Sequence, residues 1–320
     1  MPTHLSDTTE STDDTLRTMI IGPPESGKTA LVCMLKHATA QPREHNDHPG
    51  YKVFELPGAR DTHALFQKAS ETIYKGRLPI IATQGVSQYD FSLEKDLLPE
   101  SERRSRLFSH RAHTQNHVHY FRLFDGPGGA IFKQSDGDGA DRDAGSEKDY
   151  RDLLIKEGRN SQGLIVCADG NDSNKIGAFL TGLDDVMYEI GPHLPFRRIA
   201  FILTKADKFF ADHGPLAEKK AAETSPVKHL KDIIGDVALQ MFLNRFDANS
   251  QITVVCGWTS VYGFVHNQGC PNYDCEKDQL LVYDPANQRC IEHWHPFRVL
   301  DPFVFMATGN PGKMECIFKR

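Results

Sequence analysis

Residues 22–29 read GPPESGKT, from Gly22 to Thr29, and match the phosphate-loop pattern G-x-x-x-x-G-K-[ST]. The apolar run Leu16–Ile21 comes directly before them and predicts a buried strand. The segment Thr29–Ala40 follows them and has the apolar spacing of a helix. A loop between a strand and a helix turns its N–H groups toward a phosphate, and the helix dipole adds positive potential. The stretch therefore predicts a nucleotide-binding site.

Two side chains of this loop have predicted chemical roles. The Lys28 ammonium is expected to neutralise the β- and γ-phosphates, and the Thr29 hydroxyl is expected to bind Mg²⁺. The other predicted nucleotide contacts in the loop and at the start of the helix are Glu25, Ser26, Gly27 and Ala30.

Two more segments lie where they can reach the phosphates. The predicted strand His117–Phe124 runs into the tetrapeptide DGPG. Its Asp125 can hold the Mg²⁺ shell, and the N–H of its Gly128 can reach the γ-phosphate. The tetrapeptide TQGV opens the predicted strand Val86–Leu93, and its Thr83 can contact both Mg²⁺ and the γ-phosphate. The predicted catalytic set is therefore Lys28, Thr83, Asp125 and Gly128, and the predicted metal set is Thr29, Thr83 and Asp125.

A fourth segment, TKAD from Thr204 to Asp207, follows the predicted strand Arg198–Leu203. The Asp207 carboxylate can accept both the ring N–H and the exocyclic amine of guanine, while the Lys205 stem covers the ring face. Adenine presents no such pair of donors. The segment therefore favours a guanine nucleotide over an adenine nucleotide.

With GPPESGKT, TQGV, DGPG and TKAD in this order, the chain resembles the Ras-like small GTPases and the related translation-factor-class P-loop GTPases. The resemblance covers residues 16–308 by the order of elements. It implies a mostly parallel sheet of about six strands with helices on both faces. It also implies a GTP/GDP switch whose loops order around Mg²⁺ and the γ-phosphate.

The chain departs from the family pattern at several places. Thr204 stands where the family usually has Asn, which implies some loss of bonding between the loops. Gly129 stands where a Gln usually orients the attacking water, so intrinsic hydrolysis is expected to be slow. The last guanine motif of the family aligns with Cys256-Gly257-Trp258, at the end of the predicted strand Ile252–Cys256. The predicted nucleotide contacts outside the phosphate loop are thus Thr204, Lys205, Asp207, Cys256, Gly257 and Trp258.

Two functions stay open at this point, and a third is weaker. The first is a Mg²⁺-dependent GTPase that acts as a GTP/GDP switch. The second is a nucleotide-sensing interaction module that binds GTP or GDP with little hydrolysis, because Gly129 offers no side chain to orient water. A P-loop ATPase is disfavoured by Asp207. An unidentified protein effector or activating partner is expected, and the insertions at about 41–82 and 94–116 are the places for its specificity.

After residue 160, predicted strands alternate with predicted helices, which is typical of a three-layer α/β fold. We expect one domain over residues 16–308, between a polar tail at 1–15 and a second tail at 309–320. Its insertions lie at about 41–82, 94–116, 130–149 and 262–298. The predicted helices are Ala64–Lys75 with Asp61 as its cap, Tyr150–Gly158, Ile176–Ile190, one within Val227–Phe246, and one from Asp301-Pro302 to the stop at Gly309.

Composition excludes several classes of protein. The 320 residues carry a net charge of −6, which does not suit a nucleic-acid-binding protein, and 39% of them are hydrophobic, which suffices for a packed core. No apolar run is long enough to span a bilayer, and we find no signal peptide and no lipid-anchor motif. The seven cysteines predict reduced thiols and, with them, a cytoplasmic location.

Two groups of possible metal ligands have simpler interpretations. The acidic run from Asp136 to Asp143 does not keep the register of a calcium loop, and it predicts a solvated loop instead. The cysteines and histidines near the C-terminus lack a paired C-x₂-C, so a structural zinc ion is not expected. These residues are His266, Cys270, Cys275, Cys290, His293 and His295.

Overall fold

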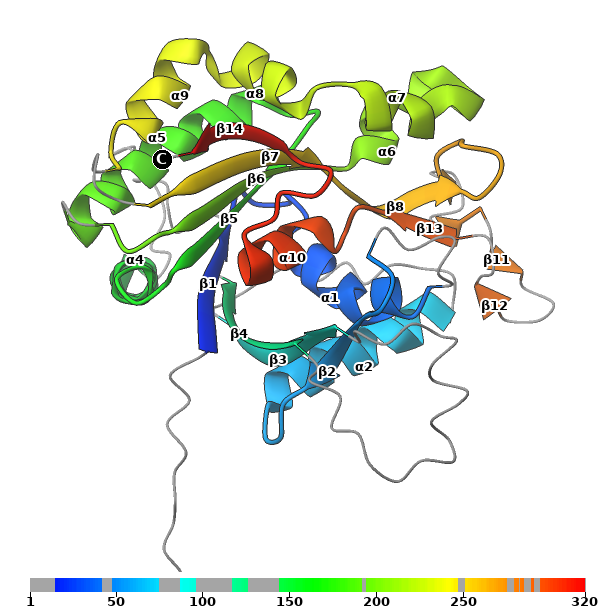
Figure 1. The fold of residues 1–320 in the computed structure, drawn as a ribbon, viewed down its shortest axis with the longest axis horizontal. Coiled ribbons are helices and arrows are strands. Elements are labelled where there is room, and N and C mark those ends of the chain that lie inside the picture. The colour runs from blue at the N-terminus through cyan, green and yellow to red at the C-terminus, as the bar shows by residue number, and fades with distance from the viewer. Residues whose placement is uncertain are drawn as a thin grey trace, which may run out of the picture.

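A computed structural model describes residues 15–41, 48–74, 87–95, 117–125, 144–191, 194–246, 251–274, 279–281, 283–284, 289–290 and 294–319. Its main feature is an eight-stranded sheet in the order β14-β7-β6-β5-β1-β4-β3-β2 (Figure 1). The strands are β1 Thr15–Ile21, β2 Tyr51–Glu55, β3 Ser87–Lys95, β4 His117–Asp125, β5 Gly163–Asp169, β6 Arg198–Thr204, β7 Thr253–Trp258 and β14 Glu315–Lys319.

The central strands of this sheet are parallel. β1 pairs in parallel with β4 and β5, and the parallel pairing continues from β5 to β6 and from β6 to β7. At the edges, β3 pairs antiparallel with both β4 and β2, and β14 pairs antiparallel with β7. The predicted α/β class is confirmed, and β2 and β14 are strands beyond the about six that were expected.

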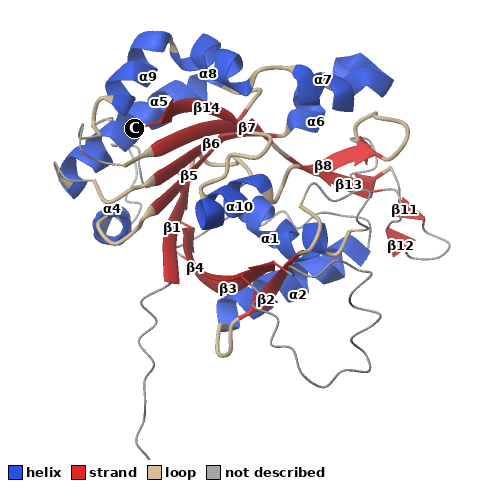
Figure 2. Ribbon diagram, viewed as in Figure 1, coloured by secondary structure: helices blue, strands red, loops and turns tan. Residues whose placement is uncertain are grey.

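Helices cover both faces of the sheet (Figure 2). One layer consists of α1 Lys28–Thr39, α2 Arg60–Tyr74 and α10 Asp301–Thr308. The opposite layer consists of α4 Ala144–Gly158, α5 Ser173–Ile190, α8 Pro226–Ile234 and α9 Asp236–Leu243.

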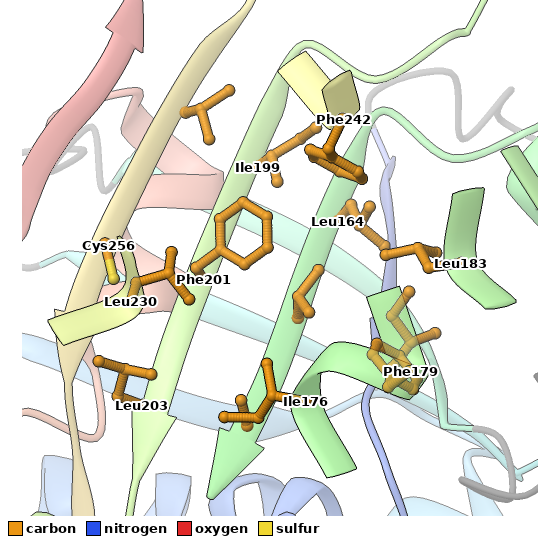
Figure 3. Close-up of a cluster of buried hydrophobic side chains, with 14 of the residues drawn as sticks. Leu164, Ile176, Phe179, Leu183, Ile199, Phe201, Leu203, Leu230, Phe242 and Cys256 are labelled. Carbon is orange, nitrogen blue, oxygen red and sulfur yellow. The ribbon is translucent and has the colours of Figure 1, made fainter. Parts of the chain in front are cut away.

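Each strand supplies both hydrophobic cores because successive side chains point to opposite faces. In β1, Ile20 packs into the core beneath α1, whereas Met19 and Ile21 pack into the core beneath α5. Figure 3 shows this second core, where Phe201 of β6 lies among side chains of α5, α8 and α9. The sheet is therefore packed between two helix layers.

Several helix boundaries differ from those predicted. α2 begins at Arg60, so Asp61 lies within its first turn and is not its cap. α4 begins at Ala144, inside the segment that we expected to be an insertion loop. The helix expected within 227–246 is two helices, α8 and α9, because Gly235 interrupts it with a φ of 81°. Between β6 and α8 lie further helices: α6 Ala206–Phe209, the 3₁₀ helix η3 Ala211–Leu216 and α7 Ala217–Glu223.

The C-terminal part also carries more structure than predicted. β7 ends at Trp258, and it is not the last strand of the sheet, because β14 lies in the segment that we expected to be a tail. The helix predicted at Asp301-Pro302 is confirmed as α10, and Gly309 caps it with a φ of 74°. The insertion at about 262–298 contains small strand pairs: β8 Ser260–Val265 with β13 Trp294–Phe297, β9 Tyr273–Asp274 with β10 Gln279–Leu280, and β11 Tyr283–Asp284 with β12 Arg289–Cys290.

Some predictions fall on residues outside the described ranges. These include residues 1–14 of the polar tail, Thr83, Gly128, Gly129, the acidic run from Asp136 to Asp143, Cys275 and His293. The tail was predicted to extend to residue 15, but Thr15 is the first residue of β1. In the ranges that are described, no group of three or more His, Cys, Asp or Glu could hold a metal ion. No helix in those ranges is both long enough and apolar enough to cross a membrane.

Candidate nucleotide-binding site

The phosphate loop lies between β1 and α1, and its backbone adopts conformations that most residues avoid. Gly27 has a φ of 80° and Glu25 a φ of 65°. A Cβ atom on Gly22 would lie 2.1 Å from the Cys167 carbonyl oxygen, so only glycine lets the loop pack this closely against β5. The Glu25 side chain is exposed and lies 3.5 Å from the Lys175 ammonium, and Ala30 is half-buried in α1. The loop is therefore a tight turn at the end of β1.

Lys28 points its ammonium into this loop. Its Nζ donates hydrogen bonds to the carbonyl oxygens of Gly22 at 3.0 Å and Pro23 at 2.9 Å. Burial lowers the pKa of Lys28 below its ordinary value, while the Asp125 carboxylate acts in the opposite direction. A cation is thus held on the inner side of the loop, where a phosphate would need it.

Thr29 and Asp125 meet beside Lys28. The Thr29 hydroxyl donates to Asp125 Oδ2 at 2.5 Å, and both residues are buried. Asp125 ends β4, next to Ile20 of β1 in the parallel register. A hydroxyl and a carboxylate are hard oxygen donors, the ligand type that Mg²⁺ prefers, so these two side chains fit that ion.

Thr204 connects the phosphate loop to the TKAD segment. Its hydroxyl lies 2.8 Å from the Ser26 carbonyl oxygen and 3.1 Å from that of Ala168. Thr204 therefore still bonds the two loops together, although some loss of this bonding was expected for Thr in place of Asn. The Ser26 hydroxyl is itself buried and has no hydrogen-bond partner within the described ranges.

Asp207 is almost completely buried, at 4% exposure, yet it is an acid. The Ser260 hydroxyl donates to its Oδ1, and the N–H of Gly263 donates to that hydroxyl at 2.8 Å. Burial raises the pKa of the Asp207 carboxyl to about 6. Nearby, Lys205 has a φ of 59° and pairs with Asp169 Oδ2 at 2.7 Å.

Ser260 is not among the residues predicted from the sequence. It is the first residue of β8, two residues after the end of β7 at Trp258, and the carbonyl of its neighbour Thr259 accepts a hydrogen bond from the N–H of Ala206 at 3.1 Å. A signal was present, because a hydroxyl just beyond the last parallel strand lies at the same sheet edge as TKAD.

The side chains of Cys256 and Trp258 are fully buried in the core. The Trp258 ring stacks on Phe209 at 5.0 Å between centroids, and its indole N–H donates to the Thr224 carbonyl at 3.1 Å. A Cβ atom on Gly257 would lie 2.6 Å from Met314. In this arrangement, the Cys256 and Trp258 side chains pack in the core. Within this stretch, only backbone groups could contact a base.

Comparisons with known proteins find no matching family model and no matching curated protein. Solved structures with some likeness include the Arl6 BBS3 small GTPase from Trypanosoma brucei with bound GppNp, at 13% identity, a TM-score of 0.36, and coverage of 77% of this chain and 87% of that one. The signal recognition particle receptor SRb-GTP/SRX complex from Chaetomium thermophilum has 13% identity, a TM-score of 0.36, and coverage of 78% and 92%. The G domain of the T. maritima FeoB iron transporter has 16% identity, a TM-score of 0.31, and coverage of 77% and 88%.

Proposed function

We propose that the chain binds GTP and GDP with Mg²⁺ and is a P-loop GTPase that acts as a GTP/GDP switch with slow intrinsic hydrolysis. The observation that carries this proposal is the hydrogen bond from the Thr204 hydroxyl to the Ser26 carbonyl. It holds the segment with Asp207 against the phosphate loop, so that one ligand can present its phosphates to Lys28 and its base to Asp207 at the same time.

The residues of the candidate site would have separate roles. The Lys28 ammonium turns from the loop carbonyls to the β- and γ-phosphate oxygens, which replace those acceptors. Thr29 and Asp125 would hold Mg²⁺, which supplies positive charge for the phosphates when it is bound. Asp207 accepts the two guanine donors, and Ser260 keeps its carboxylate oriented. Catalysis of attack by water on the γ-phosphate is then mainly a matter of positioning and charge neutralisation.

The principal alternative is an interaction module that senses GTP or GDP and hydrolyses it very little. Gly129 favours this alternative, because it cannot orient water. In either case, a protein effector or activating partner and a cytoplasmic location are part of the proposal. A single-turnover measurement of GTP hydrolysis separates the two, since only a switch returns to GDP by its own activity or by stimulation in trans.

Titration with fluorescent GTP, GDP and ATP tests the proposal. We expect guanine nucleotides to bind in preference to ATP, and Lys28→Ala to lose most of the Mg·GTP affinity. Thr29→Ala should chiefly weaken the dependence on Mg²⁺. Lys36→Ala is the matched control, because Lys36 lies on the exposed side of the same helix and pairs with Glu55 at 2.6 Å. Equal affinity for ATP and GTP, or unchanged GTP affinity in Lys28→Ala, would contradict the assignment.

A further inference from the structure

A second concave site lies away from the phosphate loop. It is a cavity of about 480 Å³ between α7, the turn after β8, strand β13 and the loop before β14. None of its lining residues belongs to the P-loop, to DGPG or to TKAD. Its polar lining residues include Lys219, Asn267, Gln268, Arg298 and Lys313.

The walls of this cavity are joined by close backbone contacts. The N–H of Glu218 in α7 donates to the Gly269 carbonyl at 3.0 Å. A Cβ atom on Gly269 would lie 2.5 Å from the Pro215 carbonyl oxygen, and one on Gly263 would lie 1.8 Å from that of His295. These approaches require glycine and fix the turn and β13 relative to α7. The cavity is therefore already formed before any ligand binds.

The charge of the cavity is opposite to that of the chain. The whole sequence carries a net charge of −6, but the lining brings together the cations Lys219, Arg298 and Lys313. Its one carboxylate, Glu218, lies 3.3 Å from the Nδ1 atom of His295, and the Lys219 ammonium lies 3.8 Å from Glu223, which is outside the lining. Across the described ranges, no carboxylate lies within 4.0 Å of the Arg298 or Lys313 nitrogens. A concave surface with such an excess of positive charge attracts anions.

Two residues that line the cavity have an unusual backbone conformation. The structure describes four residues other than glycine with a positive φ. Glu25 and Lys205 lie at the candidate nucleotide site, and Asn267 at 62° and Arg298 at 52° both line the cavity. This conformation is unfavourable for a long side chain such as Arg, and it concentrates at functional sites. At Arg298 it places the guanidinium carbon 4.7 Å from the centre of the Phe297 ring.

We propose that this cavity binds a small organic anion with two or more negative charges, carried by phosphate ester or carboxylate groups. The volume lies within the range of small-molecule sites. The guanidinium of Arg298 can engage two oxygens of one acidic group, and Lys219 and Lys313 can neutralise another. The amides of Asn267 and Gln268 add neutral hydrogen-bonding groups at the rim. The site is separate from the proposed nucleotide site and does not depend on it.

Calorimetric titration of the full chain with citrate and with inorganic pyrophosphate tests this proposal, because the two probes distinguish carboxylate from phosphate chemistry. We expect saturable binding that weakens at least about tenfold in the double variant Lys219→Gln/Lys313→Gln. Lys220→Gln/Lys228→Gln is the matched control, since both lysines are exposed and neither lines the cavity. In the unsubstituted chain, the amide resonance of Gly269 should shift with either probe.

Lys28→Ala separates this site from the phosphate loop. Citrate binding should persist in that variant, even if nucleotide binding is lost. The proposal is overturned if neither probe binds the unsubstituted chain, if both double variants weaken binding equally, or if only Lys28→Ala removes it. The second outcome would mean that net charge alone attracts the probes, and the third would mean that the probes occupy the phosphate loop.

Discussion

Asp207 shows at the scale of a single residue how the proposed binding function opposes stability. Its carboxylate is 4% exposed, and within the fold the Ser260 hydroxyl is its side-chain donor. Burial raises its pKa to about 6 from the ordinary 3.8, so the folded protein holds the charged form with difficulty near neutral pH. We infer that the charge is retained for the guanine donors that it would accept.

We therefore expect Asp207→Asn to stabilise the nucleotide-free protein at pH 7.5 while it removes the preference for guanine. The gap between 3.8 and about 6 corresponds to as much as about 3 kcal/mol. The folded carboxyl binds its proton more tightly than the unfolded one, so the penalty is absent below pH 3.8 and complete above about pH 6. Urea unfolding of the variant and of the unsubstituted protein, at pH 7.5 and near pH 4, measures this penalty as a difference in the free energy of unfolding.

The advantage of the variant should shrink as the pH falls toward 4, since Asp207 is then protonated in both states. The variant should also bind xanthine nucleotides in place of guanine nucleotides, because the amide donates to the added carbonyl. A variant that is less stable than the unsubstituted protein at pH 7.5 would show that the buried charge is compensated inside the fold.

The sequence predicted that Lys28, Thr29 and Asp125 lie close together, because its motifs fix their places relative to the strands. Lys28, Thr29 and Asp125 follow or end strands that the apolar pattern marks clearly, and parallel strands bring such ends to one edge. The pattern did not distinguish Ser260 from any other hydroxyl after a strand. Its role depends on the pairing of β6 with β7, which is a tertiary contact that the local sequence does not reveal.

At the scale of elements, Trp258 connects β7 to the helices that follow TKAD. Its ring contacts Phe209, Phe210 and His229 at centroid distances of 5.0, 5.1 and 5.0 Å. Its indole N–H reaches Thr224, at the start of the turn into α8. The pattern of this packing indicates that Trp258 positions the helices and that its ring does not read the base.

We expect Trp258→Phe to lower the free energy of unfolding by about 1–3 kcal/mol and to leave GDP affinity nearly unchanged. The lost indole leaves a void and an unpaired Thr224 carbonyl, which explains the cost. Phe201→Leu is a useful comparison, because Phe201 is equally buried in the same core but lies within β6. A fall in GDP affinity much larger than in Phe201→Leu would restore Trp258 as a base contact.

The elements that the sequence missed are those that tertiary pairing defines. The stretch YKVFE of β2 is short and lies between polar segments, and it becomes a strand only because β3 offers it an edge. β14 likewise exists because β7 is exposed on one side. In contrast, the interruption at Gly235 is local and could have been predicted from glycine alone. Propensity therefore identified the central strands better than the edges of the sheet.

At the scale of the whole molecule, the phosphate loop lies between two cores that share the sheet. Ile20 and Ile21 end β1 and pack into opposite cores. A structural change at this end of β1 therefore affects the packing of both helix layers. The segments with Thr83 and with Gly128 each adjoin this edge in sequence, through β3 and β4. In the proposed switch, these two segments respond to the γ-phosphate, and the rest of the fold stays as a frame.

Hydrogen exchange with GDP and with a non-hydrolysable GTP analogue tests whether only these two segments respond to the γ-phosphate. We expect peptides around Thr83 and within residues 126–149 to gain protection only with the analogue, because only its γ-phosphate can bind their N–H and hydroxyl groups. Peptides from β6, which is buried along most of its length, serve as the internal reference and should not change. Identical protection of both segments in the two states would reject switching while leaving nucleotide binding intact. A protein that binds both nucleotides in one conformation cannot signal which of them it holds, so that outcome would leave only a module that responds to the presence of a guanine nucleotide.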